Sequence, residues 1–317
     1  MKILVTGANG FVGKQVCELL IADQHEVRAA VRRPGTNPAG THEYLLGDLG
    51  DVNDWSNALA DVDAVIHLAA RVHVMDEGAS DPLAEFRRIN VDATVRLAKR
   101  SQELGVKRFV FMSSIAVNGA RTESAPFDVF SAVDPSGPYG QSKWEAEKAL
   151  LELTTGGDMN VISVRAPMVY GPDAPGNTRR LIGLARTGLP VPFGGVVNKR
   201  TLISVLNLAG LLMECVLQPN LEAGLVVAGD DYSPSTAELF REVSLALGLK
   251  PRIWKLPVPI LSALANAAGR TADLSRLTDS LEVRNTTTVA GLVWKPSLTF
   301  HEAIRDLGRG VNVGSKS

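Results

Sequence analysis

The chain has 317 residues, of which 45% are hydrophobic and 21% charged, and its net charge at pH 7 is −1. This balance is typical of a soluble globular protein with a sizeable core, and it excludes a disordered chain. A nearly neutral total offers no overall attraction for nucleic acid or for an anionic membrane, so we expect neither as a partner and look for phosphate sites locally.

The two cysteines, Cys17 and Cys215, lie far apart and form no CxxC motif. They predict buried reduced thiols, with no disulfide framework and no metal site. The first apolar run ends at glycines too early for a signal peptide, so we expect a cytoplasmic protein. Residues 256–268 are apolar but too few to cross a bilayer, and they predict a buried or substrate-covering helix.

Short apolar runs alternate with longer helix-patterned stretches in the first half of the chain. The runs predict strands at residues 2–6, 26–31, 64–68, 108–112 and 160–165. The stretches between them predict helices at residues 12–22, 53–60, 82–104 and 138–153. This alternation indicates successive βαβ crossovers, and therefore an α/β fold whose residues 1–165 form a doubly wound, Rossmann-like parallel sheet.

Beyond residue 165 the pattern loosens into loops rich in proline and glycine, which often shape binding sites. A strand at 224–228 and helices near 235–247 and 257–268 predict a smaller mixed substrate domain, residues 166–317, over the carboxyl edge of the sheet. Some of its segments are expected to return to the Rossmann core. The tail, residues 308–317, has little apolar content and is expected to be mobile.

The segment TGANGFVG places Gly7, Gly10 and Gly13 between the first predicted strand and the first predicted helix. Gly7 permits a tight turn, Gly10 lets the backbone approach a pyrophosphate, and Gly13 lets the helix pack on the strand. An isolated GxxGxxG can be an ordinary turn. Its position at the first βα turn favours a dinucleotide site at the helix N-terminus.

Residues at the end of the second predicted strand affect whether NAD or NADP is preferred. An acidic residue there would accept hydrogen bonds from the ribose hydroxyls, but this chain has Val31, Arg32 and Arg33. Two guanidinium groups suit a 2′-phosphate, so we expect NADP, with NAD as the alternative. Asp48 could accept a hydrogen bond from the adenine amino group, or it could cap a helix beginning near Val52.

Tyr139 and Lys143 are four residues apart in YGQSK, so on a helix they share one face. The phenol pKa is normally near 10, so a nearby cation is needed before its proton can move near neutrality. YxxxK alone is common on surface helices. Ser113 and Ser114, directly after a predicted strand, would add a hydroxyl that could hold a substrate carbonyl or alcohol.

Together these motifs resemble the extended short-chain dehydrogenase/reductase family, in particular its nucleotide-sugar epimerase, dehydratase and reductase branch, over nearly the full chain. TGANGFVG, HLAA at 67–70, Asn90, MSSIAVNG and YGQSK carry the resemblance, with Arg165 and VYGP at 169–172 leading toward the substrate. Two positions depart from the pattern: Met168 replaces a frequently polar residue, and the acidic residue after the second strand is missing.

The resemblance implies roles for individual residues. Ser114, Tyr139 and Lys143 would be catalytic, while Ser114, Asn177 and Arg200 would bind the substrate, Arg200 at the diphosphate of a UDP-sugar. The implied dinucleotide contacts are Gly7, Asn9, Gly10, Phe11, Val12, Gly13, Arg32, Asp48, Leu49, Leu68, Ala69, Ala70, Asn90, Tyr139, Lys143 and Pro167. A homodimer through helices 82–104 and 138–153 is also implied.

We favour NADPH-dependent reduction at carbon 4 of a 4-keto nucleotide sugar, because of Arg32 and Arg33. The alternative is an NAD-dependent UDP-glucose or UDP-N-acetylglucosamine 4-epimerase, which would retain its cofactor. A dehydratase is disfavoured, since Ile115 and Ala116 stand where that branch carries acids. Two further readings are a carbonyl reductase resembling dihydroflavonol reductases and an NADP-sensing protein without turnover.

Overall fold

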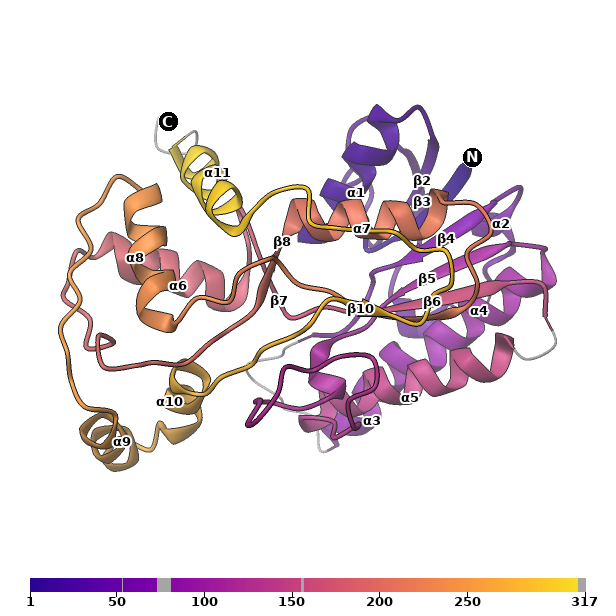
Figure 1. The fold of residues 1–317 in the computed structure, drawn as a ribbon. Helices are drawn as coiled ribbons and strands as arrows, with labels where there is room; N and C mark the ends of the chain where they lie inside the picture. The colour runs from indigo at the N-terminus through magenta and orange to yellow at the C-terminus, as the bar shows by residue number, and fades with distance from the viewer. Residues whose placement is uncertain (53, 73–80, 155–156, 313–317) are drawn as a thin grey trace.

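A computed structural model describes residues 1–52, 54–72, 81–154 and 157–312, and its centre is an eight-stranded sheet (Figure 1). The strand order is β10-β9-β6-β5-β4-β1-β2-β3, and every neighbouring pair is parallel except β10 with β9. The order reverses beside β1, as in a Rossmann sheet. The strands of this sheet are β1 (Lys2–Thr6), β2 (Glu26–Val31), β3 (His42–Leu45), β4 (Ala64–His67), β5 (Arg108–Met112), β6 (Asn160–Arg165), β9 (Gly224–Val227) and β10 (Thr286–Thr287).

Helices cover both faces of the sheet, which confirms the doubly wound prediction. One face packs against α1 (Phe11–Ala22) and α7 (Val205–Leu217), and Cys17 and Cys215 lie buried there as free thiols. The other face packs against α2 (Ser56–Leu59), α4 (Ala93–Glu103) and α5 (Gly137–Thr154). Because both faces are covered, the central strands are almost continuously buried, as a parallel sheet requires.

A further hydrophobic cluster, separate from those on the two faces of the sheet, lies beyond its carboxyl edge, at the left of Figure 1. It includes a two-stranded parallel pair, β7 (Met168–Tyr170) and β8 (Leu202–Ser204). The helices of this part are α6 (Gly176–Arg186), α8 (Thr236–Ala246), α9 (Val258–Ala267), α10 (Thr271–Thr278) and α11 (Phe300–Asn312). We call these two strands and five helices the outer subdomain.

Several predicted elements differ in the structure. The strand near 224–228 is β9, and it pairs with β6 in the main sheet. β3 was not predicted, because only one of its four residues is even partly buried and the apolar pattern is weak. The helix predicted from residue 53 is shorter, as α2; residue 53 lies outside the described part. The tail is helical through Asn312, and residues 313–317 are outside the described part.

The helix predicted at 82–104 is interrupted. It consists of α3 (Pro82–Arg87), a π-helical turn η2 (Arg88–Asp92) and α4. Such single π turns often mark functional sites, because the extra residue re-aims side chains. Two short 3₁₀ turns, η1 (Leu49–Asp51) and η3 (Ile115–Val117), follow β3 and β5 at the same edge of the sheet. No helix in the described ranges is long and apolar enough to span a bilayer.

Candidate active site

The glycine loop joins β1 to α1 in a conformation that only small residues allow. Gly7 has φ +68°, and a Cβ atom there would lie 2.9 Å from the backbone nitrogen of Ala69. A Cβ atom on Gly13 would lie 2.2 Å from the carbonyl oxygen of Gly7, so a side chain at Gly13 would separate α1 from the turn. The first turn of α1 carries no acidic residue and no side-chain cap. Its backbone N–H groups can therefore receive a pyrophosphate.

The basic turn after β2 lies beside this loop. Val31 is buried, whereas Arg32 and Arg33 are exposed, and neither arginine side chain forms a hydrogen bond or ion pair with any described residue. Asn9 of the glycine loop donates to the hydroxyl of Thr36 at 3.0 Å, and that hydroxyl donates to the Arg33 carbonyl at 2.8 Å. The glycine loop and the basic turn are thus connected, and two cations point to solvent.

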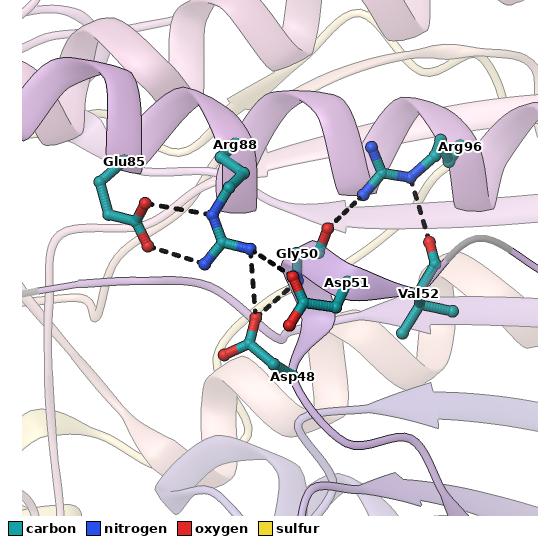
Figure 2. Close-up of polar contacts among 7 residues, drawn as sticks. All are labelled: Asp48, Gly50, Asp51, Val52, Glu85, Arg88 and Arg96. Atoms are coloured by element: carbon teal, nitrogen blue, oxygen red, sulfur yellow. Dashed lines mark hydrogen bonds and ion pairs between the residues drawn. The ribbon is translucent and has the colours of Figure 1, made fainter.

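Asp48 caps a 3₁₀ turn, not the helix predicted near Val52. Its carboxylate accepts from the backbone N–H of Gly50 at 2.9 Å and lies 3.6 Å from the Arg88 guanidinium (Figure 2). Arg88, in the π turn, also contacts Asp51 at 3.0 Å and Glu85 at 2.8 Å. These carboxylates, Glu85 first, raise the pKa of Arg88 far above its usual value. Arg88 therefore fixes the position of Asp48 at the predicted adenine side of the site.

Arg96 holds the same segment from α4. Its guanidinium donates to the carbonyl oxygens of Gly50 at 2.8 Å and Val52 at 3.1 Å, as Figure 2 shows. A Cβ atom at Gly50 would lie 1.9 Å from the Arg88 guanidinium, so a side chain there would displace the end of Arg88. Two arginines from the interrupted helix thus hold the η1 segment, including Leu49, against that helix.

A buried chain of hydrogen bonds connects β1 to the π turn through His67. The Thr6 hydroxyl lies 2.7 Å from Nδ1 of His67, and Nε2 lies 2.9 Å from the Thr94 hydroxyl. Because Thr94 donates its proton to the Asn90 carbonyl at 2.8 Å, it accepts from Nε2–H, and in the neutral imidazole Nδ1 can accept from the Thr6 hydroxyl. Burial, with Lys143 nearby, lowers the pKa of His67 to about 3. This chain connects the strand of the glycine loop to η2.

Asn90 is buried, and both the oxygen and the nitrogen of its amide form hydrogen bonds within the protein. Its oxygen accepts from the Arg71 backbone N–H at 2.8 Å, and its nitrogen donates to the Arg71 carbonyl and to the Ser142 hydroxyl, both at 3.0 Å. Asn90 is therefore placed to position the strand-end loop that follows Ala69 and Ala70. The signal for this role, a buried polar residue within a helix, is not visible in sequence.

Ser114, Tyr139 and Lys143 meet at the carboxyl end of β5. The Ser114 side chain hydrogen-bonds to the Tyr139 hydroxyl, and Lys143 Nζ lies 6.0 Å from the centre of the Tyr139 ring. Lys143 is buried and donates to the Met112 carbonyl at 2.8 Å. Burial raises the pKa of Tyr139 to about 12, opposed by the Ser114 hydrogen bond, and lowers the pKa of Lys143 to about 7, opposed by Glu147.

Ser113 faces the core instead, in a network that the sequence did not reveal. Its hydroxyl donates to the Glu147 carboxylate. The same carboxylate accepts bidentate hydrogen bonds from the Arg165 guanidinium, with Nε 2.9 Å from Oε1 and Nη2 bonded to Oε2. Arg165 also donates to the Asn118 side-chain oxygen at 3.1 Å. Glu147 lies one turn beyond Lys143, and that spacing was the only available signal. The network joins α5 to β5 and β6, and so fixes the helix that carries Tyr139 and Lys143.

The predicted substrate residues lie further out. Arg200 is partly buried, and its guanidinium donates to the Asp279 carbonyl at 3.0 Å; within the described residues it has no carboxylate in ion-pair contact. Burial lowers its pKa. Asn177 is exposed in the first turn of α6, and Pro167 is buried between β6 and β7. The structure thus brings Ser114, Tyr139 and Lys143 together, whereas Arg200 contacts Asp279 and Asn177 lies in the first turn of α6.

A groove of about 400 Å³ lies beside the glycine loop. Its lining residues come from α1, from the loop after β7 and from the start of α7, namely Phe11, Lys14, Gln15, Glu18, Pro172, Asp173, Pro175 and Val205. Phe11 connects the groove to the predicted dinucleotide site. No group of three or more His, Cys, Asp or Glu residues in the described ranges is placed to hold a metal ion.

Comparisons with known proteins agree with this geometry. The model of the NAD dependent epimerase/dehydratase family matches residues 3–218. A UDP-glucose 4-epimerase of Vibrio cholerae is 39% identical over 311 residues, covering 96% of this chain and 93% of its own. Among solved structures, the fold is similar to that of a Thermotoga maritima UDP-glucose 4-epimerase with UDP-glucose, with a TM-score of 0.78, 19% identity and 99% coverage of both chains.

A second solved structure, the Thermus thermophilus UDP-glucose 4-epimerase in complex with NAD, has a TM-score of 0.77 and 22% identity, and the match covers 99% of this chain and 100% of the other. At these identities the solved structures establish the shared fold. The family match covers the strands of the main sheet from β1 through β6, the glycine loop and the serine, tyrosine and lysine together. By its sequence and its architecture, the chain belongs to the NAD dependent epimerase/dehydratase family.

Proposed function

We propose that the protein is an NAD-dependent 4-epimerase of a UDP-linked hexose, which retains its dinucleotide through the reaction. The observation that carries this proposal is the Ser114–Tyr139 hydrogen bond with Lys143 one turn along the same helix. The 39% identical relative named a UDP-glucose 4-epimerase supports the substrate class. The sequence alone favoured an NADPH-dependent reductase, with the NAD-dependent 4-epimerase as the alternative. The 4-epimerase is the better supported of the two.

The residues present fit a dinucleotide. A Cβ atom at Gly7 or Gly13 would fill the cradle, and the open N-terminus of α1 supplies N–H donors for the pyrophosphate. When bound, the nicotinamide accepts a hydride and returns it. The exposed Arg32 and Arg33 stay free to interact with the adenosine ribose, and Asp48 is held at the adenine side by Arg88.

In this mechanism Tyr139 takes the proton of the sugar hydroxyl during oxidation and returns it during reduction. Since burial raises the pKa of Tyr139 to about 12, the phenol holds its proton at neutral pH until a cation stabilises the phenolate. Lys143 in its charged form provides that stabilisation. Ser114, which already hydrogen-bonds to Tyr139, orients the reacting oxygen. Arg200 would pair with the substrate diphosphate, because its guanidinium has donors left beyond the one used at Asp279.

The test uses purified protein without added dinucleotide. Incubation with UDP-glucose and, separately, UDP-N-acetylglucosamine should give the 4-epimer by NMR, and mass spectrometry of the denatured protein should identify NAD in place. Tyr139→Phe is the control that should retain NAD and lose epimer formation. Absence of any epimer, together with stoichiometric consumption of added NADPH by a 4-keto sugar, would contradict the epimerase.

The second candidate is therefore the NADPH-dependent 4-keto-sugar reductase, and the specific observation favouring it is the unpaired Arg32–Arg33 turn. A charge-assisted pair with a 2′-phosphate would give about a tenfold to hundredfold preference for NADPH, reduced by solvent exposure. Isothermal titration with both dinucleotides decides between them. If the turn binds the 2′-phosphate of NADPH, the double variant Val31→Asp with Arg32→Asn should shift the binding preference from NADPH toward NAD.

We also propose that the protein is a homodimer, with the α3–η2–α4 helix and α5 facing their copies across a two-fold axis. These elements lie side by side on one face of the molecule, and Arg87 of α3 pairs with Glu145 of α5 at 2.7 Å. Sedimentation equilibrium at micromolar concentration should give twice the 33.8 kDa chain mass. A monomer under those conditions would contradict the proposal.

A further inference from the structure

Helix α9 shows its apolar side to solvent, which corrects the prediction that this segment is buried. Only Leu261 of this helix is buried. Ile260 is 48% exposed and Leu264 60% exposed, and Ala263 and Ala267 are exposed beside them. These positions follow an i, i+3, i+4, i+7 spacing, so they form one stripe along the helix. Figure 1 shows α9 at the outer end of the subdomain, away from the sheet.

The chain around α9 is strongly basic. Residues 250–271 contain four Lys or Arg residues and no Asp or Glu, in a protein whose net charge is −1. Lys250, Arg252, Lys255 and Arg270 are all exposed, and Trp254 is 53% exposed among them. Of the four cations, only Arg270 has an ion-pair partner among the described residues, Asp273 at 3.2 Å. An exposed tryptophan and lysines beside an apolar stripe are typical of segments at a membrane interface.

We propose that this surface, made of Trp254, the basic residues 250–255 and the exposed stripe of α9, docks on an anionic lipid bilayer. The stripe would enter the boundary between headgroups and acyl chains while the cations face lipid phosphates. The helix lies in the plane of the interface and does not span it. Charge complementarity selects this occupant over a second copy of the chain, since two copies would bring like charges together across the contact.

The docking surface is connected to the segment that carries Arg200. Before α9, Ile253 forms an isolated β-bridge with Val191, and Lys255 forms another with Phe193. After α10, Leu281 forms an isolated β-bridge with Arg200. Both ends of the α9–α10 pair are therefore hydrogen-bonded to residues 191–200. A membrane bound to α9 would lie on the same subdomain as the residues proposed to bind substrate, and would hold that subdomain near the bilayer.

The experiment is vesicle co-sedimentation of the full chain. Vesicles of phosphatidylcholine with phosphatidylglycerol should bind the protein, vesicles of phosphatidylcholine alone should bind it more weakly, and salt should reduce the difference. The double variant Ile260→Asp with Leu264→Asp should lower binding by more than about tenfold. Lys255→Gln should lower it about fivefold.

The control for each of these Asp substitutions is Val293→Asp, which puts a single carboxylate at a 78% exposed apolar position away from α9 and should leave vesicle binding unchanged. Thermal melts and dinucleotide affinity of all variants should match the wild type, which excludes misfolding. The proposal is overturned if wild type fails to bind anionic vesicles, or if the α9 variant changes only the oligomeric state. It is also overturned if that variant changes only the KM for a soluble nucleotide sugar.

Discussion

The neutral His67 makes the stability of this fold depend on pH in a defined window. In the folded protein its pKa is lowered to about 3 by burial, with Lys143 adding to the effect, whereas the unfolded value is 6.5. Between these values the unfolded chain binds a proton that the folded chain does not. Stability contributed by the neutral imidazole is therefore present above pH 6.5 and is lost as the pH falls toward 3.

The size of the effect follows from the two pKa values. On lowering the pH from about 8 to about 5, the His67 term removes about 2 kcal/mol of unfolding free energy. His67→Gln keeps an acceptor for Thr6 and a donor for Thr94 but cannot titrate. The variant is expected to start less stable at neutral pH and then to lose about 2 kcal/mol less than wild type over the same window.

The assay is urea unfolding followed by circular dichroism at several pH values, without dinucleotide. The exposed His42, replaced by Gln, serves as the control and should follow the wild type. A direct measurement is the NMR titration of the His67 Cε1 resonance, which should stay at its neutral position down to about pH 5. A titration near 6.5, or parallel stability losses in wild type and His67→Gln, would refute the hydrogen-bonded chain as described.

Three other predictions concern the site. Tyr139→Phe should lower turnover about 10²–10⁴-fold with dinucleotide affinity retained. Because Ser114 acts on the same proton, the turnover of the double variant with Ser114→Ala should fall by less than the product of the two single effects. Strictly multiplicative effects would contradict this coupling. Arg88→Gln should weaken NAD binding about threefold to tenfold. Binding of nicotinamide mononucleotide, which lacks adenine, should be unaffected, and Arg87→Gln serves as the control. Equal losses of affinity for both ligands would indicate a general defect. Arg200→Ala should weaken UDP-sugar binding about tenfold to hundredfold by calorimetry, and an equal loss of dinucleotide affinity would count against a diphosphate contact.

The sequence alone predicted the parts of the molecule that local rules control. Apolar runs and intervening helical periods gave the parallel strands, because a strand covered on both faces must be continuously apolar. The GxxGxxG spacing gave the glycine loop, because Gly7 needs a positive φ and Gly13 has no room for a side chain. The four-residue spacing of Tyr139 and Lys143 gave their shared helix face.

The tertiary structure decided what depends on residues far apart in the chain. Asp48 and Arg88 are 40 positions apart, and their ion pair exists because η1 and η2 meet at one edge of the sheet. The roles of Glu147 and His67 depend likewise on partners from other elements, which no local pattern specifies. The apolar sequence of α9 predicted burial, since composition records how apolar a helix is but not whether another element packs against it. Only the arrangement of the outer subdomain shows that this side of the helix faces solvent.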